Sequence, residues 1–385
     1  MIDGAKPVFH VYLGTLNHHT PLGDPAPITG IFATSLNASG ALSPGRLVDQ
    51  SLNDVIWMLT DQAGAVLYAT FDIANSDQSH VAAFRIHPET ADLEFLTSQP
   101  TGGTEASHAT LSADGRHLLV ANYNPEGLVG RPDQAVRVFP VSASDGLGAP
   151  TDTVRHNGSG PRKDRQARAH PHCVLQRPNT SDIYVADLGM DRIFVYGLSK
   201  DGQLTHKPDC DFSFPAGDGP RHIVFSNDGA RMFVVCELNA KVLSYDLANA
   251  AVPTNPIDVF AISDARGVDA QPSGIALSGA GDALLVALRG CDEILSLHVS
   301  PDGKLTQAGR SDSGGKTPRD MKLLPSGRHL IVANQDGANV SVFSISPDDI
   351  GTLTKSASLV IDQPMAIAVL PYDPSATADP FKETL

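Results

Sequence analysis

Four charged or titratable residues interrupt apolar segments of the chain at similar places. His172 and Arg221 each follow a proline that opens an apolar segment, and Glu237 and Arg289 end the segments MFVVCE and LLVALR. A charge in such a segment costs several kcal/mol unless it is paired or used in chemistry. An imidazole, whose ordinary pKa is about 6.5, can act as a general base, and arginines can clamp an anion and stabilise an oxyanion. These four residues are our candidate catalytic residues, and Glu237 either orients His172 or an arginine or acts as the base itself.

Arg319 and Asp187 lie at related places and are candidate substrate-binding residues. Arg319 also follows a proline at the start of an apolar segment, and Asp187 lies at the end of another. The positions equivalent to Arg319 elsewhere in the chain hold Ile56, Ser107, Ser273 and Met365, and those equivalent to Glu237 hold Asp72, Tyr123, Leu188 and Gln335. A structural alternative stays open, in which His172 only hydrogen-bonds a neighbouring strand and Glu237 and Arg289 form an ion pair that stabilises the fold.

The elements that carry these residues recur along the chain. A short apolar strand, a glycine-containing turn and a second apolar strand follow one another at 106–123, 220–237, 271–289 and 317–335. The segment at 171–187 is a variant of this pattern, and the segment that begins at Ile56 is a degenerate copy. A third strand follows each pair, and turns such as SPDGKLT then lead into a more polar fourth strand. Four antiparallel strands in a repeated unit are typical of a β-propeller blade.

The spacing of the repeats predicts seven blades. The equivalent opening positions are 51, 65, 49, 52, 46 and 46 residues apart, an average of about 52. The last unit, from Pro364, has room only for its innermost strand, and segments 10–15, 30–36 and 47–51 are expected to supply the other three. We therefore predict an all-β fold, a seven-bladed β-propeller of four-stranded antiparallel blades with one blade closed by both termini, as a single domain over residues 1–385. A two-sheet sandwich or a solenoid is the alternative architecture.

A propeller would bring the candidate residues together. Innermost strands line the central channel, and their starts lie near one mouth, beside the ends of the neighbouring strands. The longest interval contains an inserted loop at 156–172. Together with the residue before it, this loop has five basic residues, Arg155, Arg162, Lys163, Arg165 and Arg168. We interpret this loop as a rim that attracts anions to the mouth, with a solvated loop or an oligomer contact as alternatives. Arg165 is a candidate substrate-binding residue.

Composition excludes several classes of partner. The chain has 28 Lys+Arg against 43 Asp+Glu, a net charge of −15, which disfavours binding to duplex nucleic acid. No apolar run is long enough to cross a bilayer, and residues 1–6 do not resemble the start of a signal peptide. The four cysteines lack the spacing of a zinc site or a disulfide framework. We expect a cytoplasmic protein without a nucleic-acid or membrane partner, and leave open an oligomer of identical chains.

The motifs around these residues resemble those of the seven-bladed lactonase family. They are GSGPxxxRQxxxHPH at 158–172, DLGxDxxxxY at 187–196, GDGPRHIVFSNDG at 217–229, CELN around Glu237 and ALRGCDEI around Arg289. This family contains propeller-type 6-phosphogluconolactonases and the fungal 3-carboxy-cis,cis-muconate lactonising enzyme. The resemblance implies that His172, Arg221, Glu237 and Arg289 form the active site, and adds His170 and His222, within the HPH and GPRH motifs, to the candidate substrate-binding residues. The acidic residue that often follows RQ in the family is Ala167 here.

The resemblance implies hydrolysis of a lactone without a metal or other cofactor. The expected substrate is a small anionic sugar-acid lactone, either 6-phosphogluconolactone or the lactone of an aldaric acid such as glucaric or galactaric acid. Three alternatives stay open: lactonising cycloisomerisation of a carboxymuconate, a non-catalytic propeller that binds proteins, and a calcium-dependent lactonase. The sequence does not decide whether an additional lysine, such as Lys316 or Lys322, contacts a phosphate.

Overall fold

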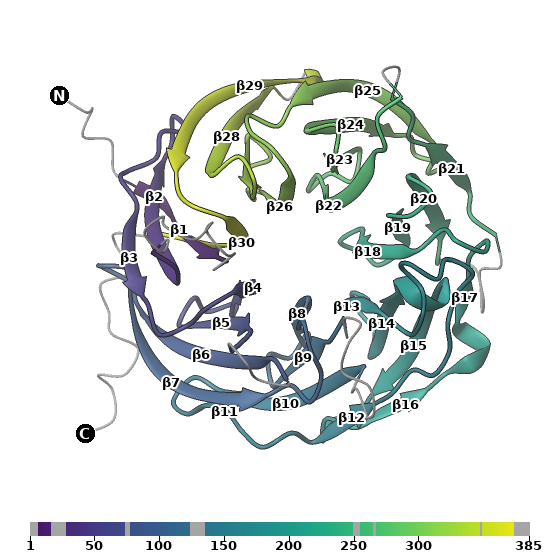
Figure 1. The fold of residues 1–385 in the computed structure, drawn as a ribbon, viewed down its shortest axis with the longest axis horizontal. Coiled ribbons are helices and arrows are strands. Elements are labelled where there is room, and N and C mark those ends of the chain that lie inside the picture. The colour runs from purple at the N-terminus through teal and green to yellow at the C-terminus, as the bar shows by residue number, and fades with distance from the viewer. Residues whose placement is uncertain are drawn as a thin grey trace.

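In the described parts of the chain, thirty strands form seven antiparallel sheets arranged around a central axis (Figure 1). The structure is a computed structural model, and it describes residues 7–16, 28–73, 78–123, 135–248, 255–264, 267–346 and 349–372. The described part of the chain contains only two short 3-10 helices, Leu188–Met190 and Pro208–Cys210. The predicted seven-bladed β-propeller is therefore confirmed. Residues 1–6, on which the argument against a signal peptide depended, lie outside the described residues.

Each blade runs outward from the central axis. The innermost strands are β4 (Val55–Thr60), β8 (His108–Leu111), β13 (Pro171–Gln176), β18 (Pro220–Phe225), β22 (Gln271–Leu277), β26 (Pro318–Leu323) and β30 (Pro364–Pro371). The second strands are β5 (Val66–Phe71), β9 (His117–Ala121), β14 (Asp182–Asp187), β19 (Arg231–Cys236), β23 (Ala283–Arg289), β27 (His329–Asn334) and β1 (Pro7–Thr15). The third strands are β6 (His80–His87), β10 (Val136–Ser142), β15 (Arg192–Leu198), β20 (Lys241–Asp246), β24 (Glu293–Val299), β28 (Asn339–Ser346) and β2 (Ile31–Asn37).

The outermost strands are more polar, as expected from the sequence. They are β7 (Asp92–Pro100), β11 (Gly146–Leu147) with β12 (Asp152–Val154), β16 (Leu204–His206) with β17 (Phe212–Ser213), β21 (Asp258–Ala261), β25 (Leu305–Asp312), β29 (Asp349–Val360) and β3 (Arg46–Asp49). Two of these edges are split into two short strands, which differs from the predicted four strands per blade. Pro150 and Pro208 lie in the two interruptions, where proline has no N–H group for a strand ladder.

The last blade is built from both ends of the described chain. β30 pairs antiparallel with β1, and Tyr12 lies opposite Ala368. β1 pairs with β2, and β2 with β3. The sheet order β3-β2-β1-β30 therefore joins the first described strand to the last one.

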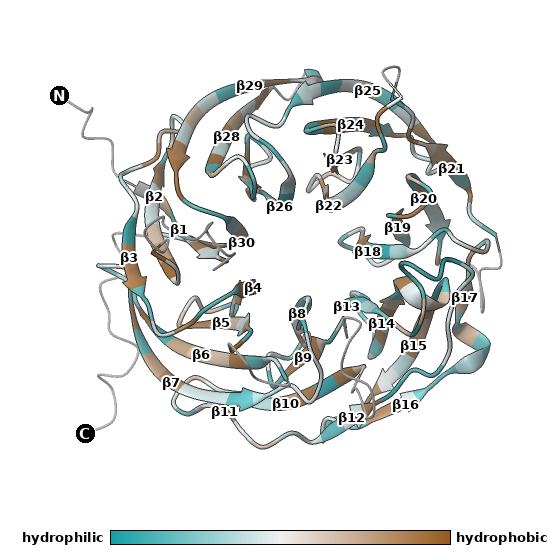
Figure 2. Ribbon diagram, viewed as in Figure 1, coloured by the Kyte–Doolittle hydropathy of each residue, from teal (hydrophilic) through white to brown (hydrophobic). Residues whose placement is uncertain are grey.

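The hydrophobic core lies between neighbouring blades. Hydrophobic residues are most frequent along the second and third strands (Figure 2), and every residue of β5 and β9 is buried. Seven large apolar clusters combine side chains from two adjacent blades each, and one of them joins Tyr184 of β14 to Phe225 of β18. Burial of this apolar surface holds the blades together and leaves the innermost strands to carry polar side chains.

Candidate active site

A pocket of about 410 Å³ lies where the innermost strands begin and the second strands end. All seven blades contribute residues to its lining, because the innermost strands converge at this mouth. Its lining residues are Leu16, Asp54, Ile56, Asp72, Glu105, Ser107, Tyr123, Arg165, His172, Glu237, Arg289, Arg319, Gln335 and Met365. A cavity of this size suits a small molecule.

A recurrent β-bulge gives the innermost strands their polar positions. The pairing of β13 with β14 passes from Pro171 to Cys173 and skips His172, and the pairing of β18 with β19 skips Arg221 in the same way. The same irregularity occurs at Ile56, Arg319 and Met365. A bulged residue leaves the ladder and its side chain is re-aimed. The position that the sequence singled out is thus the one freed from strand pairing.

Glycines next to two arginines allow tight turns at the mouth. Gly219 precedes Pro220 and Arg221 with a φ of 64°, and Gly290 follows Arg289 with a φ of 80°. A Cβ at Gly290 would lie 2.4 Å from the carbonyl oxygen of Asp269. Only glycine fits such a left-handed turn without strain.

One carboxylate lies among three guanidinium groups in this pocket. Glu237 is 3% exposed, and its Oε2 lies 2.8 Å from Nε of Arg221 and 2.7 Å from Nη2 of Arg289. Its Oε1 accepts a hydrogen bond from Arg165. Burial alone would raise the pKa of Glu237, but the three arginines together lower it well below the usual value for glutamate. Glu237 is therefore ionised at neutral pH and is a very weak base.

The guanidinium groups keep hydrogen-bonding capacity. Nε of Arg221 and both Nε and Nη2 of Arg289 are buried without a well-aligned acceptor, although two of them are in ion-pair contact with Glu237. Arg221 also donates from Nη1 to the carbonyl of Ser273 at 2.6 Å. Burial and the nearby Arg289 lower the pKa of Arg221 to about 9, so it remains protonated at pH 7. Nε of Arg289, the one of these donors that does not contact Glu237, indicates a place for an oxygen atom of a ligand.

His172 is a neutral imidazole at the wall of the same pocket. It is 6% exposed, and its Nδ1 is buried without a hydrogen-bond partner in the described residues. Burial and Arg221 lower its pKa well below 6.5, and Glu237 opposes part of this shift. The ring lies 5.3 Å from the ring of Tyr123, edge to face. The side chain is therefore held in its unprotonated form, which a general base requires.

Arg165 reaches the pocket from the basic loop at 156–172. Gln166, which is fully buried, anchors this loop by donating to the Leu188 carbonyl at 2.9 Å and to Asp191 at 2.8 Å. Asp191 in turn accepts hydrogen bonds from the backbone N–H groups of Gly217 and Gly219. The loop is thus bound to the turn that precedes Arg221, and it lies at the mouth as predicted.

A small cavity and a cluster of rings lie beneath the pocket. The cavity, of about 20 Å³, is lined in part by Arg221, His222 and Trp57. The ring of His222 lies 5.2 Å from that of His172, and Lys322 lies over the ring of Trp57 at 4.2 Å. These side chains fill the channel below the pocket.

The structure brings most of the predicted site residues together. His172, Glu237, Arg289, Arg165 and Arg319 line the pocket, Arg221 contacts Glu237 from below, and His222 lines the small cavity.

Two predicted substrate-binding residues have other surroundings. Asp187 is fully buried, and its carboxylate binds His156 at 2.7 Å and the backbone N–H groups of His170 and Met190. The ring of His170 stacks on Tyr123, whose carbonyl accepts from Nδ1 at 2.7 Å. Neither residue is among those that line the pocket, so a supporting role fits them better than substrate binding.

The sequence analysis missed two acidic residues of the pocket, Asp54 and Glu105. Each lies in a left-handed turn, at φ 42° and 48°, two places before the channel-facing position of its innermost strand. Comparison of this earlier position between repeats shows only that two of them have an acidic residue there.

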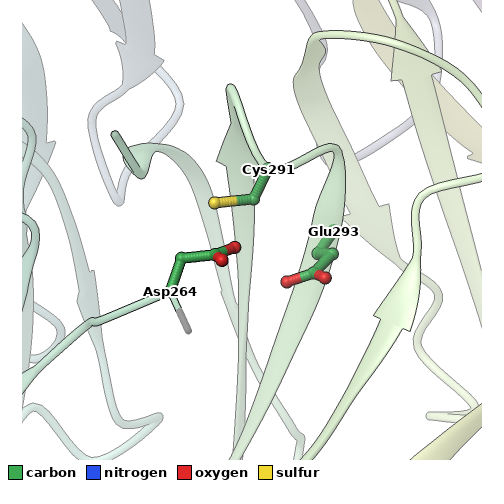
Figure 3. Close-up of side chains that lie close together, drawn as sticks. All are labelled: Asp264, Cys291 and Glu293. Carbon is green, nitrogen blue, oxygen red and sulfur yellow. The ribbon is translucent and has the colours of Figure 1, made fainter. Parts of the chain in front are cut away.

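One further polar cluster has the composition of a metal site. Asp264, Cys291 and Glu293 point toward one another (Figure 3), and one ligand atom from each lies within 4.8 Å of the others. Glu293 is also 3.2 Å from Arg310, a cation that competes with a metal ion for this carboxylate. None of the three lines the pocket. In the parts of the chain described here, no helix is long and apolar enough to span a membrane.

Comparisons with known proteins identify relatives of this chain. A family model described as a seven-bladed β-propeller lactonase matches residues 10–369. A 6-phosphogluconolactonase of Bacillus subtilis is 30% identical over 364 residues, which cover 93% of this chain and 98% of that protein. A 6-phosphogluconolactonase of Formosa agariphila is 28% identical and covers 83% and 89%.

Solved structures share the fold. A periplasmic gluconolactonase of Pseudomonas aeruginosa superposes with a TM-score of 0.82 at 22% identity, covering 95% of this chain and all of that one. A protein from Lactobacillus plantarum also has a TM-score of 0.82, at 24% identity, covering 94% and 99%.

Proposed function

The chain belongs to the seven-bladed β-propeller lactonase family and is a lactone-hydrolysing enzyme, and we propose that its substrate is a sugar-acid lactone with an anionic group remote from the ring carbonyl. 6-Phosphogluconolactone and the lactones of glucaric and galactaric acid have this chemistry. The observation that supports the proposal most is the pocket itself, in which a neutral His172 lies beside arginines and Nε of Arg289 has no acceptor among the described residues. The relatives from Bacillus subtilis and Formosa agariphila are both named 6-phosphogluconolactonase, which favours the phosphorylated lactone.

The reaction proceeds by attack of water on the lactone carbonyl. His172 takes a proton from the water while the water oxygen bonds to the carbonyl carbon. Arg289 donates to the oxyanion that forms, and the charge of Arg221, buried beneath the pocket, stabilises it further. The ring C–O bond then breaks, and the leaving alkoxide takes the proton from His172. The product is the open hydroxy acid, whose carboxyl group loses its proton to solvent. Glu237 holds Arg221 and Arg289 in place and offsets the positive charge on the protonated His172.

Glu237 is the less suitable base of the two candidates. The arginines that surround it lower its pKa, so its ionised form has little affinity for a proton. A base must hold the proton of water for long enough to let the ring open. Burial and Arg221 also lower the pKa of His172, but His172 starts from a higher ordinary value, so we propose it for the proton transfers.

Arg289→Gln is expected to lower kcat/KM on an anionic lactone by about 10²-fold or more, because it removes an oxyanion donor and a partner of Glu237. The measurement is proton release in weak buffer, with 6-phosphogluconolactone, gluconolactone and glucaro- and galactarolactone as substrates. Arg328→Gln is the matched control, since Arg328 is exposed on the turn between β26 and β27. Acid release at the wild-type rate by Arg289→Gln would contradict this role. If the wild-type enzyme hydrolyses none of these lactones, the alternative is a muconate cycloisomerase, which is measured by the loss of diene absorbance.

EDTA is expected to leave lactone hydrolysis unchanged, because the proposed mechanism uses only His172 and the arginines. The matched variant is Cys291→Ser, which removes the sulfur of the Asp264–Cys291–Glu293 cluster outside the pocket. Initial rates are compared before and after dialysis against EDTA, and with added calcium. A loss of activity that calcium restores would instead support the calcium-dependent alternative.

A cytoplasmic location and an oligomer of identical chains also stay proposals. None of the four cysteines forms a disulfide bond, as is usual in a reducing compartment. One structural neighbour is a periplasmic protein.

A further inference from the structure

Charge is divided across the pocket. Arg165, Arg289 and Arg319 form a guanidinium wall, and Asp54, Asp72 and Glu105 form a carboxylate wall. The guanidinium wall comes from the blades of β22 and β26 and from the loop before β13. The carboxylate wall comes from two neighbouring blades, those of β4 and β8. A ligand in this pocket therefore meets cations on one side and carboxylates on the other.

Among the described residues, no ion pair joins the guanidinium wall to the carboxylate wall. Glu237 is in contact with Arg165 and Arg289, whereas Arg319 has no ion pair or hydrogen bond to any described side chain. The side chain of Glu105 likewise has no hydrogen-bond or ion-pair partner among the described residues. Both line the same pocket, and each influences the pKa of the other. Arg319 and Glu105 therefore interact electrostatically without direct contact. A ligand can lie between this unpaired cation and this unpaired carboxylate.

We propose that Glu105, with Asp72 beside it, is a specificity-determining residue that accepts hydroxyl groups of the substrate and rejects a carboxylate on that side. This inference rests on the proposed function, because it concerns how the same pocket orients a lactone. The ring carbonyl faces His172, Arg221 and Arg289, and the remote anion lies on Arg319. The hydroxyl groups of a sugar lactone then face the carboxylate wall.

The hydrogen-bonding chemistry of a carboxylate supports this orientation. In its ionised form it only accepts hydrogen bonds, so a hydroxyl group is a good partner and a second carboxylate is a poor one. Burial and the charge of Asp72 raise the pKa of Glu105, and Arg319 opposes this shift. Negative charge is therefore already unfavourable at this wall, and a carboxylate of the ligand would add to it.

The carboxylate wall would discriminate between two kinds of substrate that the guanidinium wall alone would accept. A sugar-acid lactone has hydroxyl groups for Glu105 and Asp72. A carboxymuconate carries three carboxylates and no hydroxyl group, so at least one carboxylate comes close to the acidic side. The carboxylate wall thus favours a polyhydroxylated ligand.

The test uses Glu105→Gln, which keeps the size of the side chain and removes its charge. We expect kcat/KM for 6-phosphogluconolactone to fall about tenfold, through KM more than kcat, because a charged acceptor is lost. A carboxylated γ-butyrolactone without hydroxyl groups should show no such fall. By calorimetry, 3-carboxy-cis,cis-muconate should bind the variant about tenfold more tightly than the wild type, and 6-phosphogluconate more weakly. Glu89→Gln, on the exposed turn between β6 and β7 of the blade that carries Asp72, is the control.

The outcomes distinguish this inference from the proposed function. Equal changes on both lactones together with unchanged binding of the tricarboxylate would overturn the role of Glu105, even in an active lactonase. If the wild-type enzyme hydrolyses no lactone, the proposed function fails, and the two calorimetric titrations still decide the role of Glu105. Asp72→Asn should shift the same binding ratio in the same direction by a smaller factor, and it replaces Glu105→Gln if that variant does not fold.

Discussion

His172→Gln is expected to lower kcat for lactone hydrolysis by about 10²- to 10⁴-fold and to leave KM nearly unchanged. Glutamine can hydrogen-bond water, but it cannot take a proton from it. The position lies in a bulge outside the strand ladder, so the substitution should not alter strand pairing. Stopped-flow proton release gives kcat and KM, and the melting temperature checks the fold. An equal loss in a Tyr123→Phe variant would show that the effect comes from the pocket wall rather than from a base.

The pH dependence of the wild-type enzyme gives a second readout of the same residue. Because burial and Arg221 lower the pKa of His172 well below 6.5, its basic form is already dominant at pH 6.5. The acid limb of kcat/KM should therefore lie below pH 6.5, and activity should be lost only as the pH falls through this depressed pKa. An acid limb centred at or above pH 6.5 would contradict the assignment of His172 as the base.

Glu237→Gln is expected to impair both stability and catalysis. The carboxylate is in contact with three guanidinium groups, of which Arg221 is 2% exposed, and its loss leaves that charge buried without a counter-ion. Removing one member of a buried ion pair typically costs about 3–5 kcal/mol, so we expect a decrease of about 3 kcal/mol in the free energy of unfolding. Activity should fall by at least about 10²-fold, since Arg221 and Arg289 lose the group that holds them. Urea unfolding and proton release measure the two effects.

Acid unfolding provides a check on the sign of this effect. The pKa of Glu237 is lower in the folded protein than in the unfolded chain, so its stabilising contribution is present at neutral pH. That contribution is lost only as the pH falls below the ordinary glutamate range. The wild-type protein should therefore lose stability relative to Glu237→Gln only in acid. A stability difference that is the same at pH 7 and at pH 2 would contradict this account, and Glu89→Gln serves as the control at both values.

The sequence contains enough information for the fold and for most of the catalytic cluster. Propeller blades repeat, so a position that packs should hold similar residues in every blade. His172, Arg221 and Arg319 break that rule at one position, and the β-bulge explains why this position is free to differ. Glu237 and Arg289 break it at the strand end that lies next to the bulge.

Other features depend on side-chain partners that lie far apart in sequence. Asp187 has the type and phase of a site residue, but His156, 31 positions earlier, occupies its carboxylate. Asp54 and Glu105 precede their strands in turns where an acidic residue is unremarkable by itself. Only the arrangement of three blades around the axis shows that they share a pocket with Arg319. Spacing along one chain does not contain this information.

The pairing of β30 with β1 also constrains the order in which the protein can fold during synthesis. The other six blades are each made of consecutive strands, so each has all its strands soon after they leave the ribosome. β1, β2 and β3 emerge first, yet the inner partner of β1 begins at Pro364. Until that strand emerges, the inner edge of β1 keeps its N–H and C=O groups unpaired and is open to other strands. We therefore expect the nascent chain to be most prone to misassociation through β1, and formation of the last blade to be the slowest step because it joins the most distant segments.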